Sequence, residues 1–426
     1  MLFPEDFLHY LWKFRLFNQL NLKTSCGQDL QILSTGIHNK DSGPDFENAR
    51  VKIADQIWAG TVEIHLKSSD WKKHQHQRDK AYENVILHVV YESDDQIYRD
   101  DNSLIPELIL QDLIPDDAIC KYEELMMNLS WIPCENLLPN VNEVYIDSWL
   151  SRMITERLET KSLSINKLLD EYKGSWDDAF YISIARNFGF KTNALPFELL
   201  ARSLPQQILA KHKNNPFQIE SLLFGQAGFL NDHFEDEYPR KLQKEYEFLK
   251  LKYSLRPIDK FIWKYMRLRP QNFPCIRIAQ FAALISKSSF LFSKTLQLED
   301  VKELRSLFEN LEINPYWLDH YYFDKRSNEV SKNLGTDSVN NILINTVAVS
   351  MFAFGKQLGI QKYTDNALEL LENLPGEINQ VLNRFRKTGI KAENSFRSQA
   401  LMHLKSSYCD HKKCLHCGIG IKLLKQ

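Results

Sequence analysis

Ionisable and apolar side chains alternate between residues 57 and 67. Glu63, His65 and Lys67 occupy every second position, with apolar residues between them. Successive side chains of a strand point to opposite faces, so these three share one face and the apolar residues form a core on the other. Upstream, Asp45 follows a Gly-Pro turn signal, and a turn can hold its carboxylate at a strand edge. We therefore expect Asp45 and Glu63 to converge on one cation.

An Asp and a Glu at a strand edge bind Mg²⁺ or Mn²⁺ through oxygen, and the ion then activates water and offsets charge on a phosphate. His65 or Lys67 would orient or deprotonate that water. This interpretation makes Asp45, Glu63, His65 and Lys67 the catalytic residues. In the structural alternative, Glu63 and His65 only face solvent and Asp45 only caps a turn.

The order of these residues resembles the PD-(D/E)xK nuclease superfamily. There a Pro-Asp precedes a hairpin whose second strand carries Glu-x-Lys, and here Pro44-Asp45 is followed by Glu63-Ile64-His65. The resemblance covers residues 1–135 and implies a restriction-endonuclease-like sheet domain that cleaves nucleic acid with a metal ion. The sequence departs from the pattern at His65, where the superfamily has Lys, and Lys67 on the same face is a possible substitute.

A second arrangement of metal ligands follows directly in the chain. His74 and His76 alternate, Asp79 lies three residues further on, and His88 falls within an apolar strand pattern. Alternating histidines bind a borderline metal, with Glu63 or His88 completing the shell, and this would suit a metalloenzyme acting on small molecules. The alternative is a loop that contacts phosphate or faces water, because it is flanked by the bases Lys72, Lys73, Arg78 and Lys80.

The carboxyl-terminal tail carries a C-x4-C-x2-C pattern formed by Cys409, Cys414 and Cys417. Thiolates this close in sequence hold Zn²⁺ tetrahedrally, and a closed shell leaves no position for substrate, so we expect a structural role. An iron–sulfur cluster and unliganded thiols are the alternatives. The fourth ligand is left open among three residues: His411, His416 and Cys134.

A basic stretch in the second half of the chain is a candidate nucleic-acid surface. Lys264, Arg267, Arg269 and Arg277 are interleaved with aromatic residues, a mixture that can follow a phosphate backbone and stack on bases. In the alternative, an amphipathic helix buries its aromatics and directs its bases toward the acidic segment 92–124. Further bases between residues 384 and 413 lead into the cysteine pattern, as in small zinc elements that contact nucleic acid.

The pattern of the chain predicts an α+β fold. We expect strands at residues 30–34, 49–53, 57–67, 85–91 and 108–110, with helices at 4–17 and 116–129. From residue 142 onward helical patterns replace them. This gives three parts: a mixed-sheet domain flanked by helices over residues 1–135, a larger irregular helical domain over 142–394, and a helix with the cysteine-rich tail over 395–426.

Composition and targeting signals narrow the class of protein. The chain has 426 residues, 43% of them apolar and 25% charged, which is ordinary for a globular protein of two or three domains and excludes general disorder. Glu5 and Asp6 stand where a secretory signal would be basic, and the uncharged run 338–355 contains asparagines that favour a buried helix over a membrane span. Seven cysteines, an odd number, argue against a disulfide framework. We expect a cytoplasmic protein with no membrane partner.

Segments spread over the whole chain resemble an uncharacterised bacterial family of domains of unknown function. They are GPDF, GTVEIHLKSSDWKKHQH, YENVILHVVYESD, IPC, RLRPQNFPCIRIAQ and the C-x4-C-x2-C tail. This resemblance implies no activity. The leading functional hypothesis is therefore a metal-dependent nuclease acting on DNA or RNA. The alternative is a non-catalytic nucleic-acid-binding or assembly protein with a degenerate nuclease domain.

Overall fold

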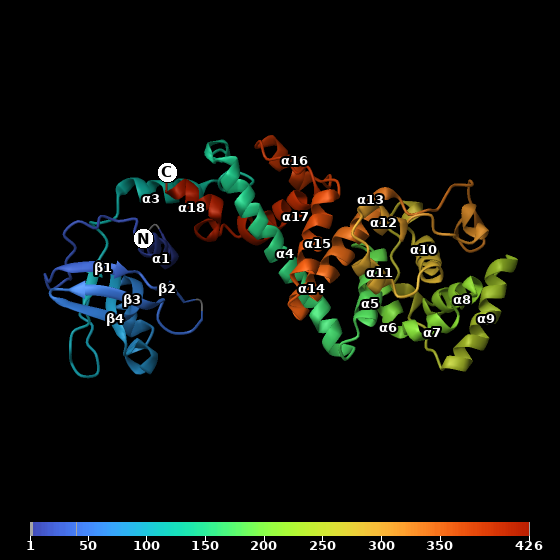
Figure 1. Cartoon of the computed structure of the whole chain (residues 1–426), viewed down its shortest axis with the longest axis horizontal. Helices are drawn as coiled ribbons and strands as arrows, with labels where there is room; N and C mark the ends of the chain where they lie inside the picture. The colour runs from blue at the N-terminus through green and yellow to red at the C-terminus, as the bar shows by residue number, and fades with distance from the viewer. Residues whose placement is uncertain (1–2, 40, 426) are drawn as a thin grey trace. The chain divides into compact units, whose positions relative to one another are not determined.

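The computed structural model describes residues 3–39 and 41–425, and the chain divides into two compact units (Figure 1). Unit 1 comprises Met1–Trp149 and Leu404–Gln426, and unit 2 comprises Leu150–His403. The predicted α+β class, with a mixed sheet in the amino-terminal part and a larger helical part after it, is confirmed. The carboxyl-terminal tail belongs to the same compact unit as the sheet.

Unit 1 is built on a six-stranded mixed sheet of order β1-β3-β4-β5-β6, with β2 paired to β3. The first four strands pair antiparallel, whereas β5 runs parallel to both β4 and β6. All five predicted strands are present, and β2 is an additional short strand between the first two of them. The strands are β1 (Leu30–Ser34), β2 (Ile37–His38), β3 (Phe46–Ile53), β4 (Gln56–Lys67), β5 (Val85–Glu92) and β6 (Glu107–Ile109).

The central strand β4 is buried on both faces where it carries the candidate residues. Val62 and Ile64 are fully buried, as the alternation predicts, but Glu63 and His65 are also only 4% and 1% exposed. Their face is covered because the chain between β4 and β5 folds back over it, beginning with α2 (Asp70–Lys73), which packs against β4. The candidate residues therefore lie in a covered interior and not on an open face.

Helices α1 (Glu5–Phe14), α3 (Asp116–Met127) and α18 (Gly418–Leu424) complete unit 1. The apolar face of α1 is buried, its first turn is acidic as suits a helix amino end, and Arg15 ends it in a left-handed conformation. This helix packs against β4, while α18 packs against α3. These contacts explain why the tail is part of unit 1.

Two irregularities in the sheet bring Asp45 and Glu63 to the same level. Asn48 has a left-handed φ of 57°, and the pairing of β3 with β4 shifts between Phe46 and Ala49. This insertion of one extra residue is a β-bulge. Beyond it Phe46 pairs with Val62, so Asp45 lies opposite Glu63 where β3 begins.

Unit 2 is almost entirely helical apart from a short hairpin of β7 (His320–Tyr322) and β8 (Lys325–Arg326). The segment Thr336–Leu358 is long and apolar enough to span a membrane, but most of it is buried within the protein, as the sequence analysis expected. It contains a π-helical turn, η7 (Leu343–Val347). The helices are α4 (Glu143–Glu171), which begins in unit 1, α5 (Trp176–Phe188), α6 (Ala194–Ser203), α7 (Gln206–Lys211), α8 (Pro216–Gln226), α9 (Glu237–Tyr253), α10 (Pro274–Lys287), α11 (Leu291–Gln297), α12 (Val301–Ser306), α13 (Thr336–Ile342), α14 (Ala348–Leu358), α15 (Gln361–Asn373), α16 (Gln380–Lys387) and α17 (Ser395–Leu404).

Gly60 controls how closely β4 approaches β5. A Cβ at this position would lie 2.6 Å from the backbone oxygen of Asn84, which accepts a hydrogen bond from the Thr61 amide. We expect Gly60→Ala to destabilise unit 1 by about 1–3 kcal/mol, because backbone cannot yield as a flexible side chain can. Chemical unfolding measures this, with Gly335→Ala as the control, since a Cβ there meets nothing within 4 Å. Equal stability of the two variants would contradict the close approach.

Glu220, buried in α8, should make unit 2 less stable as the pH rises. Burial raises the pKa of Glu220 to about 7, although the Tyr238 hydroxyl donates a hydrogen bond to it. The folded state therefore holds a proton that the unfolded state releases near pH 4.5, and stability falls between pH 4.5 and about 7. Glu220→Gln should flatten this dependence in thermal melts, whereas Glu247→Gln, at an exposed position of α9, should leave it unchanged.

Candidate metal centre

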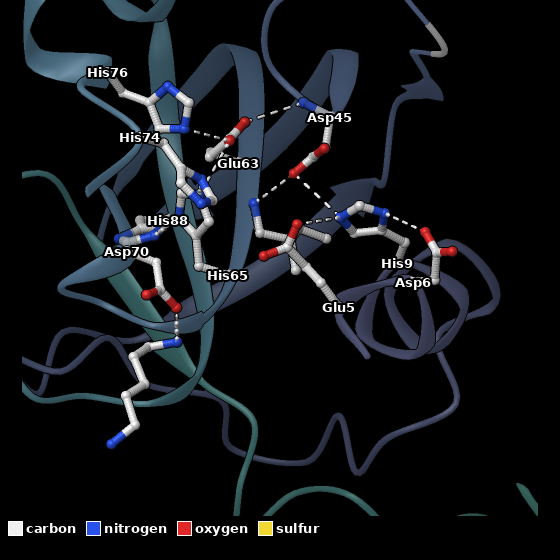
Figure 2. Close-up of polar contacts among 12 residues, drawn as sticks. Glu5, Asp6, His9, Asp45, Glu63, His65, Asp70, His74, His76 and His88 are labelled. Atoms are coloured by element: carbon white, nitrogen blue, oxygen red, sulfur yellow. Dashed lines mark hydrogen bonds and ion pairs between the residues drawn. The ribbon is translucent and has the colours of Figure 1, made fainter. Parts of the chain in front are cut away.

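Three histidine side chains meet at the covered face of β4 (Figure 2). His65 lies on β4, His74 ends α2, and His76 begins the 3₁₀ turn η1 (His76–Arg78). Their metal-binding nitrogens all lie within 4.8 Å of one another, and no other group of three His, Cys, Asp or Glu side chains in residues 3–39 and 41–425 does so. Gln75 has a left-handed φ of 63°, and this turn of the chain allows both flanking histidines to approach His65.

Glu63 adds an oxygen to the three nitrogens. Its Oε1 lies 3.4 Å from His65 Nε2 and 3.2 Å from His76 Nε2, and His65 Nε2 lies 3.1 Å from His74 Nδ1. Ligands at about 2.0–2.1 Å from a tetrahedral ion are about 3.3 Å apart, so these separations fit one ion. Three nitrogens and an oxygen suit Zn²⁺ or another transition ion better than Mg²⁺.

Hydrogen bonds orient Glu63 and His65. The backbone amide of Asp45 donates to Glu63 Oε2 at 3.1 Å, which leaves Oε1 directed at the histidines. His65 Nδ1 lies 2.9 Å from His88 Nε2 on β5. If His65 carries its proton on Nδ1, its Nε2 presents a lone pair to the ion, and such a supporting bond is typical of metal-binding histidines.

Two further residues support His88 from the next strand. Glu107 on β6 accepts a hydrogen bond from the Ser68 hydroxyl at 2.6 Å, and its Oε2 lies 3.8 Å from His88 Nδ1. His88, Glu107 and Ser68 are all buried. Side chains on three neighbouring strands therefore form one polar row that ends at the histidine group.

Burial keeps these histidines in the form that binds metal. Burial, followed by the neighbouring His88, His76 and His74, lowers the pKa of His65 to about 3. Burial likewise lowers the pKa of His88 to about 3, and it lowers the pKa of His76. Neutral imidazoles bind metal with little competition from protons.

The pKa of Glu63 is shifted in the opposite direction. Burial, followed by the negative charge of Asp45, raises the pKa of Glu63 to about 9. A carboxyl group in this environment gains from a nearby cation, because a positive charge offsets both desolvation and the repulsion from Asp45. The electrostatics of the site therefore favour a bound divalent ion.

Asp45 lies opposite Glu63, but its carboxylate is engaged elsewhere, and binding of one cation by both residues stays a prediction. Its Oδ2 accepts a hydrogen bond from the Ile64 amide at 2.8 Å and lies 3.3 Å from His9 Nε2 on α1. Burial acts to lower the pKa of His9, but the hydrogen bond and charge of Asp45 outweigh it, and the net pKa is raised. Figure 2 shows Asp45 directed toward His9 while Glu63 is directed toward His76.

The side chain of Lys67 is occupied at the end of β4. Its Nζ lies 3.1 Å from Glu92 Oε2 on β5, and both side chains are partly exposed. The structure thus gives Lys67 a surface ion pair, while the residues nearest His65 are histidines and Glu63.

Solvent reaches the group from one side. His74 is exposed, in contrast to His65. A pocket of about 490 Å³ opens beside His76, lined among others by Trp71, Tyr82 and Arg78. The His76 ring stacks on Tyr82 at 3.9 Å between centroids, which holds it against this pocket.

Comparison with known proteins identifies the family. The sequence matches the family described as "Protein of unknown function (DUF2851)" over residues 5–380. The chain belongs to the DUF2851 family. No curated protein and no solved structure matches it. The resemblance to a family of unknown function is thereby confirmed, and the resemblance of this DUF2851 chain to PD-(D/E)xK nucleases stays a prediction.

The cysteines of the DUF2851 chain predicted to bind metal all lie in unit 1. Cys134, Cys414 and Cys417 are buried and Cys409 is partly buried, whereas His411 is exposed. Among these described cysteines, no three sulfur atoms all lie within 4.8 Å of one another, whereas the three histidine nitrogens do.

The predicted nucleic-acid contacts divide into two kinds. Lys264, Arg267 and Arg269 are exposed and lie between two short 3₁₀ turns, η4 (Lys260–Ile262) and η5 (Pro270–Asn272), so the amphipathic helix of the alternative interpretation does not form over these residues. Arg277 on α10 is 5% exposed and donates to Gln280, Asn272 and Ser338. The guanidinium of Arg277 therefore has a structural role within unit 2.

The sequence patterns do not indicate His9, Glu107 or Ser68 as neighbours of the site. His9 lies on a helix that the pattern correctly predicts, but no local motif connects α1 with Asp45. The alternation of His74 and His76 in the sequence is the signal that these two histidines converge on one site.

His74 offers the cleanest test of the metal centre, since it is exposed and its loss should spare the fold. We expect His74→Ala to weaken binding of Zn²⁺ or Co²⁺ at this site by about 10-fold or more, because it removes one of the nitrogen ligands. Isothermal titration of metal-stripped protein measures the affinity. The matched control is His233→Ala, at an exposed position of unit 2. Unchanged affinity in His74→Ala would contradict the site.

Proposed function

We propose that the chain is a metal-dependent phosphodiesterase that acts on nucleic acid, with its ion held by His65, His74 and His76 beside Glu63. The observation that carries this proposal is the approach of Glu63 Oε1 and His74 Nδ1 to His65 Nε2, at 3.4 and 3.1 Å. Burying neutral imidazole nitrogens next to a carboxyl group costs free energy unless they have partners, and a bound cation would supply one.

The arrangement supports a catalytic ion more than a purely structural one. Catalytic sites present three protein ligands and keep a position open, and here the exposed side of His74 gives access to solvent. When bound, a divalent ion supplies Lewis-acid chemistry, lowering the pKa of water and offsetting charge on a phosphate.

Glu63 is the proposed proton acceptor. In this role Oε1 would accept a proton from the reacting water and would not itself bind the ion, while Oε2 is fixed by the Asp45 amide. Burial and Asp45 raise the pKa of Glu63. A bound cation would act against both causes and favour the ionised carboxylate, which is the form that accepts a proton. His88 and Glu107 position His65 and do not contact the substrate in this proposal.

The substrate class rests on the resemblance and on charge. Asp45 and Glu63 follow the order of the PD-(D/E)xK motif and lie opposite each other at the start of β3. Lys72, Lys73 and Arg78, which flank the two histidines, are exposed and suit a phosphate backbone. The nitrogen ligands favour Mn²⁺, Co²⁺ or Zn²⁺, and Mg²⁺ remains the ion expected from the carboxylates alone.

A second candidate is hydrolysis of a small molecule at the same centre. The pocket of about 490 Å³ beside His76 supports it, because this volume suits a small ligand better than a polymer. Trp71 and Tyr82 supply apolar walls and Arg78 a positive charge.

Glu63→Gln tests the proposal directly. Purified protein should cleave DNA or RNA with Mn²⁺, Co²⁺, Zn²⁺ or Mg²⁺, and Glu63→Gln should lower kcat/KM by about 100-fold or more, because the amide cannot accept the proton. The control is Glu47→Gln, at an exposed position on β3, which should keep full activity. Cleavage that survives Glu63→Gln would refute the assignment.

Two further variants locate the ion. Loss of activity in His74→Ala with transition metals assigns the ion to the histidine group. Loss in Asp45→Asn alone, with Mg²⁺ as the best cofactor, would instead assign it to the carboxylate pair. Turnover of small phosphodiesters without cleavage of either polymer would favour the second candidate.

A further inference from the structure

We propose that Cys134, Cys409, Cys414 and Cys417 bind one structural zinc ion that fastens the tail to the sheet domain. This inference is independent of the proposed function and concerns a different part of unit 1. The four cysteines come from positions separated by up to 283 residues, yet all belong to the same compact unit.

The segment around Cys414 and Cys417 has the shape of a tight metal-binding turn. Cys414 begins the 3₁₀ turn η9 (Cys414–His416), and the amide of Cys417 donates to the Cys414 carbonyl at 3.2 Å. A Cβ at Gly420 would lie 2.3 Å from that carbonyl oxygen, so the turn requires glycine there. Two cysteines separated by two residues on such a turn can bind one ion together.

Hydrogen-bond donors surround the Cys417 sulfur. Burial raises the pKa of Cys417, while hydrogen bonds from the backbone of Gly420 and Ile419 act to lower it. Amides directed at a sulfur stabilise a thiolate, the form that binds zinc. A buried cysteine that stays an uncharged, unreactive thiol does not need hydrogen-bond donors at its sulfur.

Cys134 is the better fourth ligand. It is buried in the segment that follows α3, and its carbonyl accepts hydrogen bonds from the amides of Leu137 and Leu138, both at 3.0 Å, which fixes its position. Lys412, two residues before Cys414, donates a hydrogen bond from Nζ to the Met126 carbonyl at 2.6 Å, which places the tail beside the end of α3, the helix that precedes Cys134. His411, in contrast, is exposed.

Cys409 comes from the other side of the tail loop. It ends the π-helical turn η8 (Lys405–Cys409), and the Lys413 amide donates back to the Tyr408 carbonyl at 3.0 Å. Burial, then Cys134, Cys417 and Cys414, raise its pKa. Sulfurs around zinc are about 3.8 Å apart, so binding requires these side chains to rotate toward one another.

The consequence of the site is attachment of the tail. The tail also contacts unit 1 through α18, which packs against α3, and through the hydrogen bond that Lys412 Nζ donates to the Met126 carbonyl at 2.6 Å. A tetrahedral shell of four thiolates has no open position, so the ion supplies stability and no chemistry.

Zinc content tests the site in the full-length protein. Elemental analysis should show one equivalent of zinc lost in Cys417→Ser and in Cys134→Ser, and none lost in the control Cys120→Ser, an exposed cysteine of α3. His74→Ala should keep this equivalent, so failure of this site and failure of the histidine centre are distinguishable. Unchanged zinc in Cys417→Ser would overturn the proposal, as would iron with the absorption of an iron–sulfur cluster.

A second measurement avoids variants that fail to fold. Titration of the wild-type protein with an organomercurial should release one equivalent of zinc as four thiols react, and Co²⁺ in its place should show intense thiolate-to-cobalt absorption. The His411→Ala variant should retain both signals. Loss of the cobalt signal in His411→Ala but not in Cys134→Ser would refute Cys134 as the fourth ligand.

Discussion

The burial of Glu63 and His65 on the central strand is the constraint on which the rest of unit 1 depends. Both residues are ionisable and almost fully covered, and a buried polar group costs free energy unless it is paired. Each has a partner from a neighbouring strand: the Asp45 amide before β3 bonds Glu63, and His88 on β5 bonds His65. Polar pairing therefore fixes the register of the sheet at its centre, in addition to the apolar packing of Val62 and Ile64.

The same constraint explains why the site lies on β4, the strand that pairs antiparallel with β3 on one side and parallel with β5 on the other. The parallel pairing needs a crossover connection, and this connection carries His74 and His76 over the covered face. A hairpin would have left His65 facing solvent. The topology thus places two ligands over residues that the strand alone would leave open to solvent.

The strands were predictable from the sequence because alternation and β-branched content are local signals, and the five expected segments match β1, β3, β4, β5 and β6 closely. The tertiary part of the site was less predictable. Whether His74 and His76 reach His65 depends on the left-handed conformation of Gln75, which no pattern in the sequence requires. His9 reaches Asp45 through packing of α1, and Arg277 is buried on α10 although the other candidate bases Lys264, Arg267 and Arg269 are exposed. Contacts between segments that are distant in the sequence determine the positions of these side chains.

The two proposed ions of unit 1 are separated by the chemistry of their ligands. Three histidine nitrogens beside Glu63 leave an exposed side at His74, and such a set binds an ion while it keeps a position for another group. Four sulfurs form a closed set that favours zinc and excludes water. A thiolate near the histidine centre would compete for the same ion and close its coordination shell. We therefore expect no cysteine close to β4. The sequence follows this rule, since residues 57–92, which span β4, its covering segment and β5, contain no cysteine.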